Sequence, residues 1–150
     1  MASTFRCIKL HVVFATRDRV PSLTSDVRPR LHAYLGGIAK NLGMLPLAIG
    51  GVADHVHLLL DHPTDLAPAD AVRDLKSNSS KWIHEELRDM KAFHWQSGYG
   101  VFSVSPASVP RVIRYIERQE EHHRHVSLRD EMERFLREAG VPFDDRFLVG

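Results

Sequence analysis

Residues 44–62, MLPLAIGGVADHVHLLLDH, decide the fold that the sequence predicts. The segment holds two apolar runs that are rich in branched side chains. Gly50-Gly51 lie near the end of the first run and Ala53-Asp54 separate it from the second, a pattern typical of a β-hairpin with a short loop. The segment therefore predicts two antiparallel strands, over 44–52 and 55–62. Every other element is expected to pack around this pair.

The remaining elements follow on both sides of the hairpin. Residues 6–15 and 97–105 have the side-chain pattern of strands. Apolar residues at helical spacing predict helices over 27–42, 69–90, 109–122 and 128–139. Ser25 or Asp26 is expected to cap the first helix.

The order is βαββαβ followed by two helices, which predicts a ferredoxin-like α+β fold. In this fold a four-stranded antiparallel sheet carries two helices on one face. The other face is expected to remain available for a site. The chain has no repeat, no low-complexity tract and no long linker, so we expect a single domain over 1–150.

Composition narrows the class of protein. The single cysteine, Cys7, cannot form an internal disulfide, which favours a reducing cytoplasm, and we expect it to be a small core residue. The sequence lacks an apolar run of membrane-spanning length and an export signal, so no membrane partner is expected. The net charge of +1 does not indicate a polybasic nucleic-acid binder. Seven basic and only three acidic side chains fall in residues 1–60, which permits a local phosphate-binding surface.

A pair of histidines in the second hairpin strand is the first candidate for chemistry. His55 and His57 share one face because strand side chains alternate, while Val56, Leu58 and Leu60 line the other. The pair is therefore expected to face away from the helix layer. Two imidazoles on the water-facing side of an ordinary strand would give the same pattern.

The helix predicted over 109–122 offers a nucleophile and a further ligand. Tyr115 and Gln119, at i and i+4, are expected to project side by side from its surface. A tyrosine at the edge of an apolar helix stripe is the simpler interpretation of Tyr115 alone.

In combination these motifs resemble the HUH nucleases, in particular the single-tyrosine transposases of the insertion sequence 200/605 family. The resemblance runs along the whole chain, from LHVVFATRDRVP through ADHVHLLL, LKSNSSKWIHE and HWQSGYGVFSVSPASV to YIERQEEHHR and the closing FDDRFLVG. It implies that His55, His57 and Gln119 bind a divalent ion, Mg²⁺ or Mn²⁺. It also implies that the Tyr115 hydroxyl attacks a DNA phosphate, leaving a 5′-phosphotyrosine and a free 3′-OH.

Elementary chemistry is consistent with this assignment. A phenol has a pKa near 10 and a phosphodiester is anionic, so attack requires neutralised charge and aligned oxygens, which a hard dication supplies.

Asp54 is a weak candidate to orient an imidazole or contact the ion. His122, His123 and His125 are expected to interact with a helix C-terminus, with phosphate contact as the alternative, and are not assigned as metal ligands.

The resemblance implies single-stranded DNA with a subterminal hairpin as substrate, and a homodimer in which the loop over 103–110 decides whether the tyrosine helix serves its own subunit or its partner. Trp95 and Tyr99 are candidates to stack on bases, although Trp95 could equally be core. Weak candidates for phosphate contact, which could equally be solvated surface, are Lys9, Arg17, Arg19, Arg73, Lys76 and Lys81.

Two other functions stay open at this point. One is a domesticated nuclease like the repeat-associated tyrosine transposases. The other is a non-catalytic ferredoxin-like nucleic-acid-binding module, in which the histidines and Tyr115 are coincidental. Metal-dependent covalent capture of DNA separates this module from the enzymes.

Overall fold

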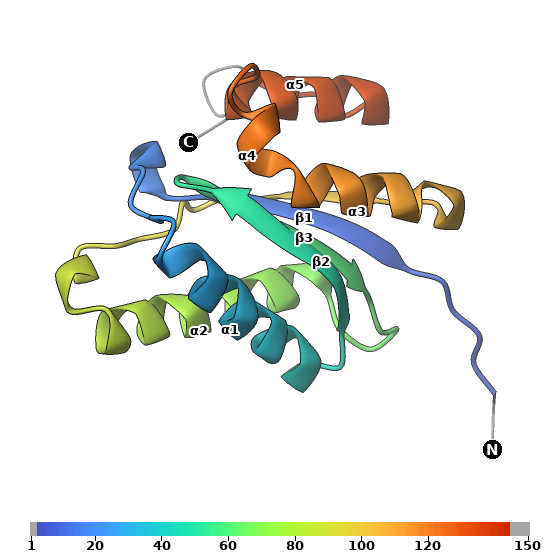
Figure 1. Cartoon of the computed structure of the whole chain (residues 1–150). Helices are drawn as coiled ribbons and strands as arrows, with labels where there is room; N and C mark the ends of the chain where they lie inside the picture. The colour runs from blue at the N-terminus through green and yellow to red at the C-terminus, as the bar shows by residue number, and fades with distance from the viewer. Residues whose placement is uncertain (1–2, 145–150) are drawn as a thin grey trace.

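The computed structural model describes residues 3–144, and its centre is a four-stranded antiparallel sheet (Figure 1). The spatial order of the strands is β2-β3-β1-β4. Their bounds are β1 (Lys9–Ala15), β2 (Leu45–Val52), β3 (His55–Asp61) and β4 (Gly100–Ser103). The ferredoxin-like topology and the antiparallel hairpin of β2 and β3 predicted from the sequence are confirmed. The last residues of the closing FDDRFLVG motif lie outside the described residues.

Two helices cover one face of the sheet, as predicted. They are α1 (Val27–Asn41) and α2 (Pro68–Glu86), seen below the strands in Figure 1. Val56, Leu58 and Leu60 of β3 are at most 1% exposed and pack with the buried faces of both helices in the main apolar core. Burial of these side chains, at about 25 cal/mol per Å² of apolar surface, fixes which way β3 faces.

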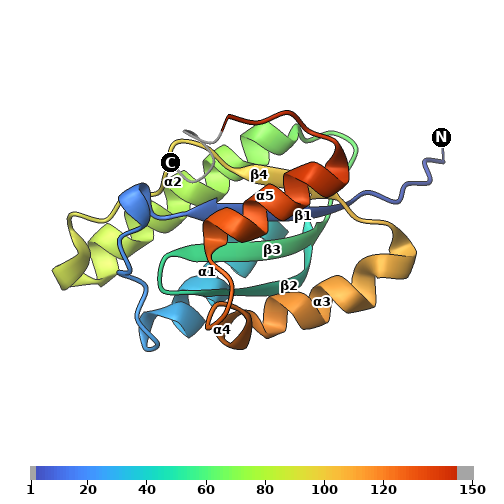
Figure 2. The same ribbon diagram turned by 90° about the horizontal axis from the view of Figure 1, so that it is seen from above.

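The second face of the sheet is also covered, which corrects the expectation that it stays available. α3 (Val109–Glu117), α4 (Gln119–His122) and α5 (Leu128–Ala139) lie across it, with α5 crossing over β1 and β3 in Figure 2. Met132 and Leu128 of α5 pack with Val13 and Ala15 of β1 in a second, smaller apolar cluster. The apolar stripe of α5 needed a surface to cover, and this sheet face provides it.

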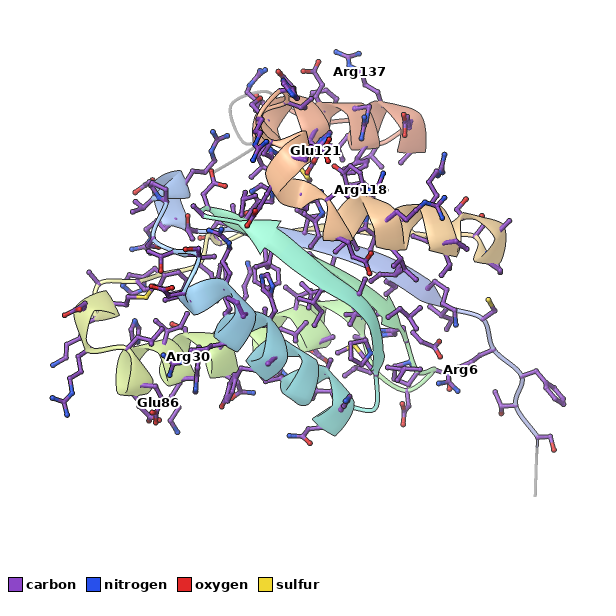
Figure 3. The ribbon with its side chains drawn as sticks, viewed as in Figure 1. Arg6, Arg30, Glu86, Arg118, Glu121 and Arg137 are labelled. Atoms are coloured by element: carbon purple, nitrogen blue, oxygen red, sulfur yellow. The ribbon has the colours of Figure 1, made fainter. Side chains whose placement is uncertain are left out.

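α3 and α4 are separate helices, so the prediction of one continuous helix over 109–122 is wrong. Arg118, labelled in Figure 3, has φ −105° and ψ 25° and interrupts the helix between Tyr115 and Gln119. α3 can approach β2 closely because residue 50 is glycine: a Cβ there would collide with the backbone carbonyl oxygen of Ile116.

Several local predictions need correction. Asp26 precedes α1 but its side chain makes no capping hydrogen bond. Cys7 is exposed and free instead of buried, because β1 begins only at Lys9. The helix predicted over 69–90 ends at Glu86 and is followed by the 3₁₀ turn η2 (Arg88–Met90); two further 3₁₀ turns are η1 (Arg17–Arg19) and η3 (Pro106–Ser108). Within residues 3–144, every helix is too short or too polar to cross a bilayer.

Candidate metal and nucleophile site

The two histidines of β3 lie under the second helical layer. His55 and His57 are opposite Ala15 and Val13 of β1 in the strand register. Both are 0% exposed, so the water-facing interpretation of the pair does not hold. Their ring centroids are 5.1 Å apart, which brings the two imidazoles into one buried space between the sheet and α3–α5.

One ring nitrogen of each histidine has a partner that orients the ring. Nδ1 of His55 donates to Oδ1 of Asp54 at 2.7 Å. Nδ1 of His57 lies 2.8 Å from Nε2 of His11, which comes from the neighbouring strand β1. Because Nδ1 of His55 carries the proton of its bond to Asp54, Nε2 of His55 holds a lone pair that can bind an ion. Nε2 of His57 holds the corresponding lone pair in the tautomer whose Nδ1 donates to His11.

Three groups from the second layer meet these Nε2 atoms. Oε1 of Gln119 lies 3.3 Å, and Nε2 of His123 lies 3.1 Å, from Nε2 of His55. Oε1 of Glu131, on α5, lies 2.9 Å from Nε2 of His57. The potential ligand atoms of His55, His57, His123 and Glu131 all lie within 4.8 Å of one another.

Tyr115 borders the same space. Its hydroxyl donates a short hydrogen bond to Oε2 of Glu131 and lies 3.4 Å from Nε2 of His122. Its ring meets that of His57 edge-on, with centroids 5.6 Å apart. The structure thus brings the predicted nucleophile next to the predicted His pair, within one chain. Gln119 donates through Nε2 to the backbone oxygen of Tyr115 at 3.2 Å.

Burial sets the ionisation of these groups. It lowers the pKa of His57 to about 4, although the nearby Glu131 opposes the change, and lowers the pKa of His11 to about 3. Both rings are therefore neutral at pH 7, the form that binds metals. Burial alone would raise the pKa of Glu131, but His123 and His57 outweigh it and hold that pKa far below its usual range. Burial and then the Glu131 carboxylate raise the pKa of Tyr115 well above 10.

The residues predicted to contact DNA differ in their partners. Lys9, Arg19 and Arg73 each pair with a carboxylate of the chain, and Arg17 and Lys81 are exposed. Nζ of Lys76 donates to the backbone oxygens of Gln96 and Gly98 at 2.8 and 2.6 Å. Burial lowers the pKa of Lys76 to about 8.

The two aromatic candidates for base stacking differ in their surroundings. Trp95 is 8% exposed, belongs to the main core and donates to Oγ of Ser79 at 2.9 Å. Tyr99 is 40% exposed, and Nζ of Lys76 lies 5.6 Å from its ring centroid. Only Tyr99 of the two is accessible to an unpaired base.

Sequence reasoning missed two residues of this site and left a third unassigned. His11 could have been found from alternation, since it shares the β1 face of Val13 and Ala15. Glu131 is three residues after Leu128, in a stripe that continues with Met132 and Phe135, and an acidic residue in an apolar stripe points to a buried partner. His123 belonged to a cluster that was assigned to a helix end.

Proteins of known family are similar to this chain in sequence and in fold. The profile of the family described as "Transposase IS200 like" matches residues 4–119. The transposase for insertion sequence element IS200 of Salmonella typhimurium is 27% identical over 116 residues, 74% of this chain and 76% of that protein. The ISDra2 transposase TnpA of Deinococcus radiodurans is 26% identical over 117 residues, 75% of this chain and 84% of that protein.

Two solved structures of transposases have a fold similar to that of this chain. A crystal structure of a Deinococcus radiodurans R1 protein, described as a transposase, superposes with a TM-score of 0.67 and 27% identity, covering 79% of this chain and 95% of that one. The REP-associated tyrosine transposase bound to a REP hairpin shares the fold, with a TM-score of 0.61 and 16% identity over 84% of this chain and 76% of that one. Because the family profile covers most of the sequence, the chain belongs to the IS200-like transposase family.

Proposed function

We propose that this protein cuts and rejoins single-stranded DNA at the ends of a mobile element, with Tyr115 as nucleophile and with a divalent ion bound by His55, His57 and Gln119. The observation that carries the proposal is the position of Tyr115 in the buried histidine cluster: its hydroxyl donates to Glu131 and lies 3.4 Å from Nε2 of His122, and its ring is edge-on to that of His57. A tyrosine packed only for stability would need one partner for its hydroxyl and not this set of ionisable groups.

In the cleavage step, the Tyr115 oxygen bonds to phosphorus while the bond from phosphorus to the 3′ oxygen breaks. The phenol proton passes to the Glu131 carboxylate, which already accepts its hydrogen bond. The 3′ oxygen leaves and takes up, as 3′-OH, the proton that Glu131 received, and the 5′ phosphate remains on Tyr115. Rejoining is the reverse reaction, with a 3′-OH as the attacking group.

The charges around Tyr115 support metal dependence. The raised pKa of Tyr115 and the lowered pKa of Glu131 together disfavour transfer of the phenol proton. Attack therefore requires additional positive charge near the oxygen and the phosphate. A divalent ion bound at this site supplies that charge and orients the phosphate oxygens. His55 and His57 are suited to hold it because their second nitrogens are fixed by Asp54 and His11.

Single-stranded DNA carrying a hairpin is the substrate class that fits the family best, since the REP-associated relative of the same fold was solved bound to a hairpin. A homodimer and a cytoplasmic location complete the proposal. The domesticated repeat nuclease would use the same site, so it differs in substrate and not in chemistry.

The test uses labelled single-stranded DNA from the ends of the element, incubated with the protein and Mg²⁺ or Mn²⁺, then run on a denaturing gel. The wild type is expected to yield a covalent protein–DNA adduct, and Tyr115→Phe to yield none while still binding the hairpin. Tyr99→Phe is the matched control, because Tyr99 is 40% exposed and outside the histidine cluster. An adduct formed by Tyr115→Phe at the wild-type level would refute the assignment of Tyr115 as nucleophile. Absence of an adduct with the wild type would favour the non-catalytic binding module.

A further inference from the structure

The C-terminal helix α5 contributes a buried carboxylate that is surrounded by imidazoles. Glu131 is 0% exposed, and its carboxylate oxygens pair with Nε2 of His57 at 2.9 Å, of His122 at 2.8 Å and of His123 at 3.1 Å. Burying an ionised carboxylate costs several kcal/mol, on the order of the whole stability of a domain, unless a cation offsets it.

Two atoms of this cluster meet each other and no third group. Nε2 of His57 and Oε1 of Glu131 lie 2.9 Å apart as an ion pair, and neither bonds to another group among the described residues. Buried polar groups are rarely left with unused hydrogen-bonding capacity in folded proteins. An imidazole nitrogen and a carboxylate oxygen that converge at this distance are arranged like two ligands of one ion.

α5 holds Glu131 in place on its inner side. Ser127 caps the helix, its Oγ accepting from the backbone nitrogen of Asp130 at 3.2 Å, and Leu128 and Met132 on either side of Glu131 anchor it on the sheet. The outer side is different: Glu133 pairs with Arg137 at 2.7 Å, and Arg137 projects away from the sheet in Figure 3. Position 131 is thus fixed by packing, as a ligand requires.

We infer that Glu131 and His123 are further ligands of the ion proposed at His55, His57 and Gln119, and that a centre with three imidazoles and one carboxylate selects a transition ion such as Mn²⁺ or Zn²⁺ over Mg²⁺. Imidazole nitrogen is a favourable ligand for transition ions, whereas Mg²⁺ prefers oxygen ligands and retains its waters. The inference refines the metal dependence in the proposed function and rests on it. Glu131 then has two roles, Oε1 facing the ion and Oε2 accepting from Tyr115.

The experiment measures metal binding in the absence of DNA. The metal-free full-length protein is titrated with Mn²⁺ in a calorimeter, and Mn²⁺ is then competed with Mg²⁺ or Zn²⁺. Glu131→Gln keeps the shape of the side chain and is expected to raise the Kd for Mn²⁺ at least about tenfold, because even partners behind the ligands are worth that much. A tenfold excess of Mg²⁺ is expected to leave bound Mn²⁺ in place, and Zn²⁺ to displace it.

Three further variants separate the roles of these groups. Glu133→Gln changes a carboxylate on the outer side of α5 and is expected to bind Mn²⁺ as the wild type does. Tyr115→Phe removes a donor to the Glu131 carboxylate but leaves both carboxylate oxygens, so it is expected to raise the Kd for Mn²⁺ by less than Glu131→Gln does. His123→Asn is expected to weaken Mn²⁺ binding like Glu131→Gln, which provides a second measurement if one variant folds poorly by circular dichroism.

The outcome is decisive in either direction. A folded Glu131→Gln protein with the wild-type Kd for Mn²⁺, or equal competition by Mg²⁺ and Mn²⁺, would overturn the inference. Failure of the proposed function gives a different result: Mn²⁺ binding would depend on Glu131, but the wild type would form no covalent DNA adduct.

Discussion

Replacing His11 by phenylalanine should weaken metal binding although His11 is not itself proposed as a ligand. His11 is 4% exposed, and its Nε2 lies 2.8 Å from Nδ1 of His57. Its pKa is lowered to about 3 by burial, then by His57, so the replaced ring is neutral at pH 7 and no charge is lost. The Phe ring can pack against Phe135, whose centroid is 5.4 Å from that of His11.

The expected magnitude follows from this geometry. Losing the partner that orients a metal-binding histidine costs about 10- to 100-fold in affinity, or about 1.4–2.7 kcal/mol. Leaving Nδ1 of His57 buried without a partner lowers the free energy of unfolding of the metal-free protein by about 1–3 kcal/mol. The affinity loss should be the same at pH 6.5 and pH 8, because an orientation effect does not titrate in that range.

The assay is calorimetric titration with Mn²⁺ together with urea unfolding. His62→Phe is the matched control: His62 is 3% exposed and its Nε2 lies 2.6 Å from the backbone oxygen of Leu66, outside the cluster. It should lose comparable stability and keep the wild-type Kd. A folded His11→Phe protein that binds Mn²⁺ as tightly as the wild type would refute the reasoning.

Three further changes test other parts of the structure. Gly50→Ala should lower the free energy of unfolding in urea by about 1–3 kcal/mol, because the added Cβ meets the backbone of α3; Gly37→Ala, where no atom lies within 4 Å, should not destabilise. Binding of labelled single-stranded DNA, followed by anisotropy, should weaken as the pH rises through about 8, where Lys76 loses its charge, and Lys76→Arg should remove this step; an identical step in both proteins would exclude Lys76. Mixed dimers of His55→Ala and Tyr115→Phe chains should not regain cleavage, because the site is complete within one chain; recovered cleavage would show that the tyrosine helix serves the partner.

The strand pattern around residues 44–62 was enough to predict the antiparallel hairpin of β2 and β3 and the shared face of His55 and His57. Alternation of side chains is a local property, so short-range reasoning captures it. The helical layer of α3, α4 and α5 that buries those histidines was not predictable in the same way. It depends on where α5 packs, and an amphipathic helix indicates that it covers a surface without indicating which one.

The helix break at Arg118 is a further feature of the structure that the sequence did not predict. The apolar stripe ends at Ile116, and the polar residues 117–122 contain neither Gly nor Pro to end the predicted helix, while the chain turns at Arg118 to bring Gln119 and His123 towards His55. Propensity gives little indication of such a break, because tertiary contacts outweigh it. His11, Glu131 and His123 were therefore missed or left unassigned: each gains its role only from neighbours that are distant in the sequence.

The division of the site between two parts of the chain makes it open to engineering. The segment shared with the family, residues 4–119, contains the His pair, Tyr115 and Gln119, whereas Glu131 comes from the tail beyond it. Exchanging residues 120–144 for the corresponding tail of another family member would change the donor set without altering the sheet. A collection of such chimaeras would then vary in metal preference while sharing one nucleophile, and overall sequence identity would be a poor guide to which ion each one uses.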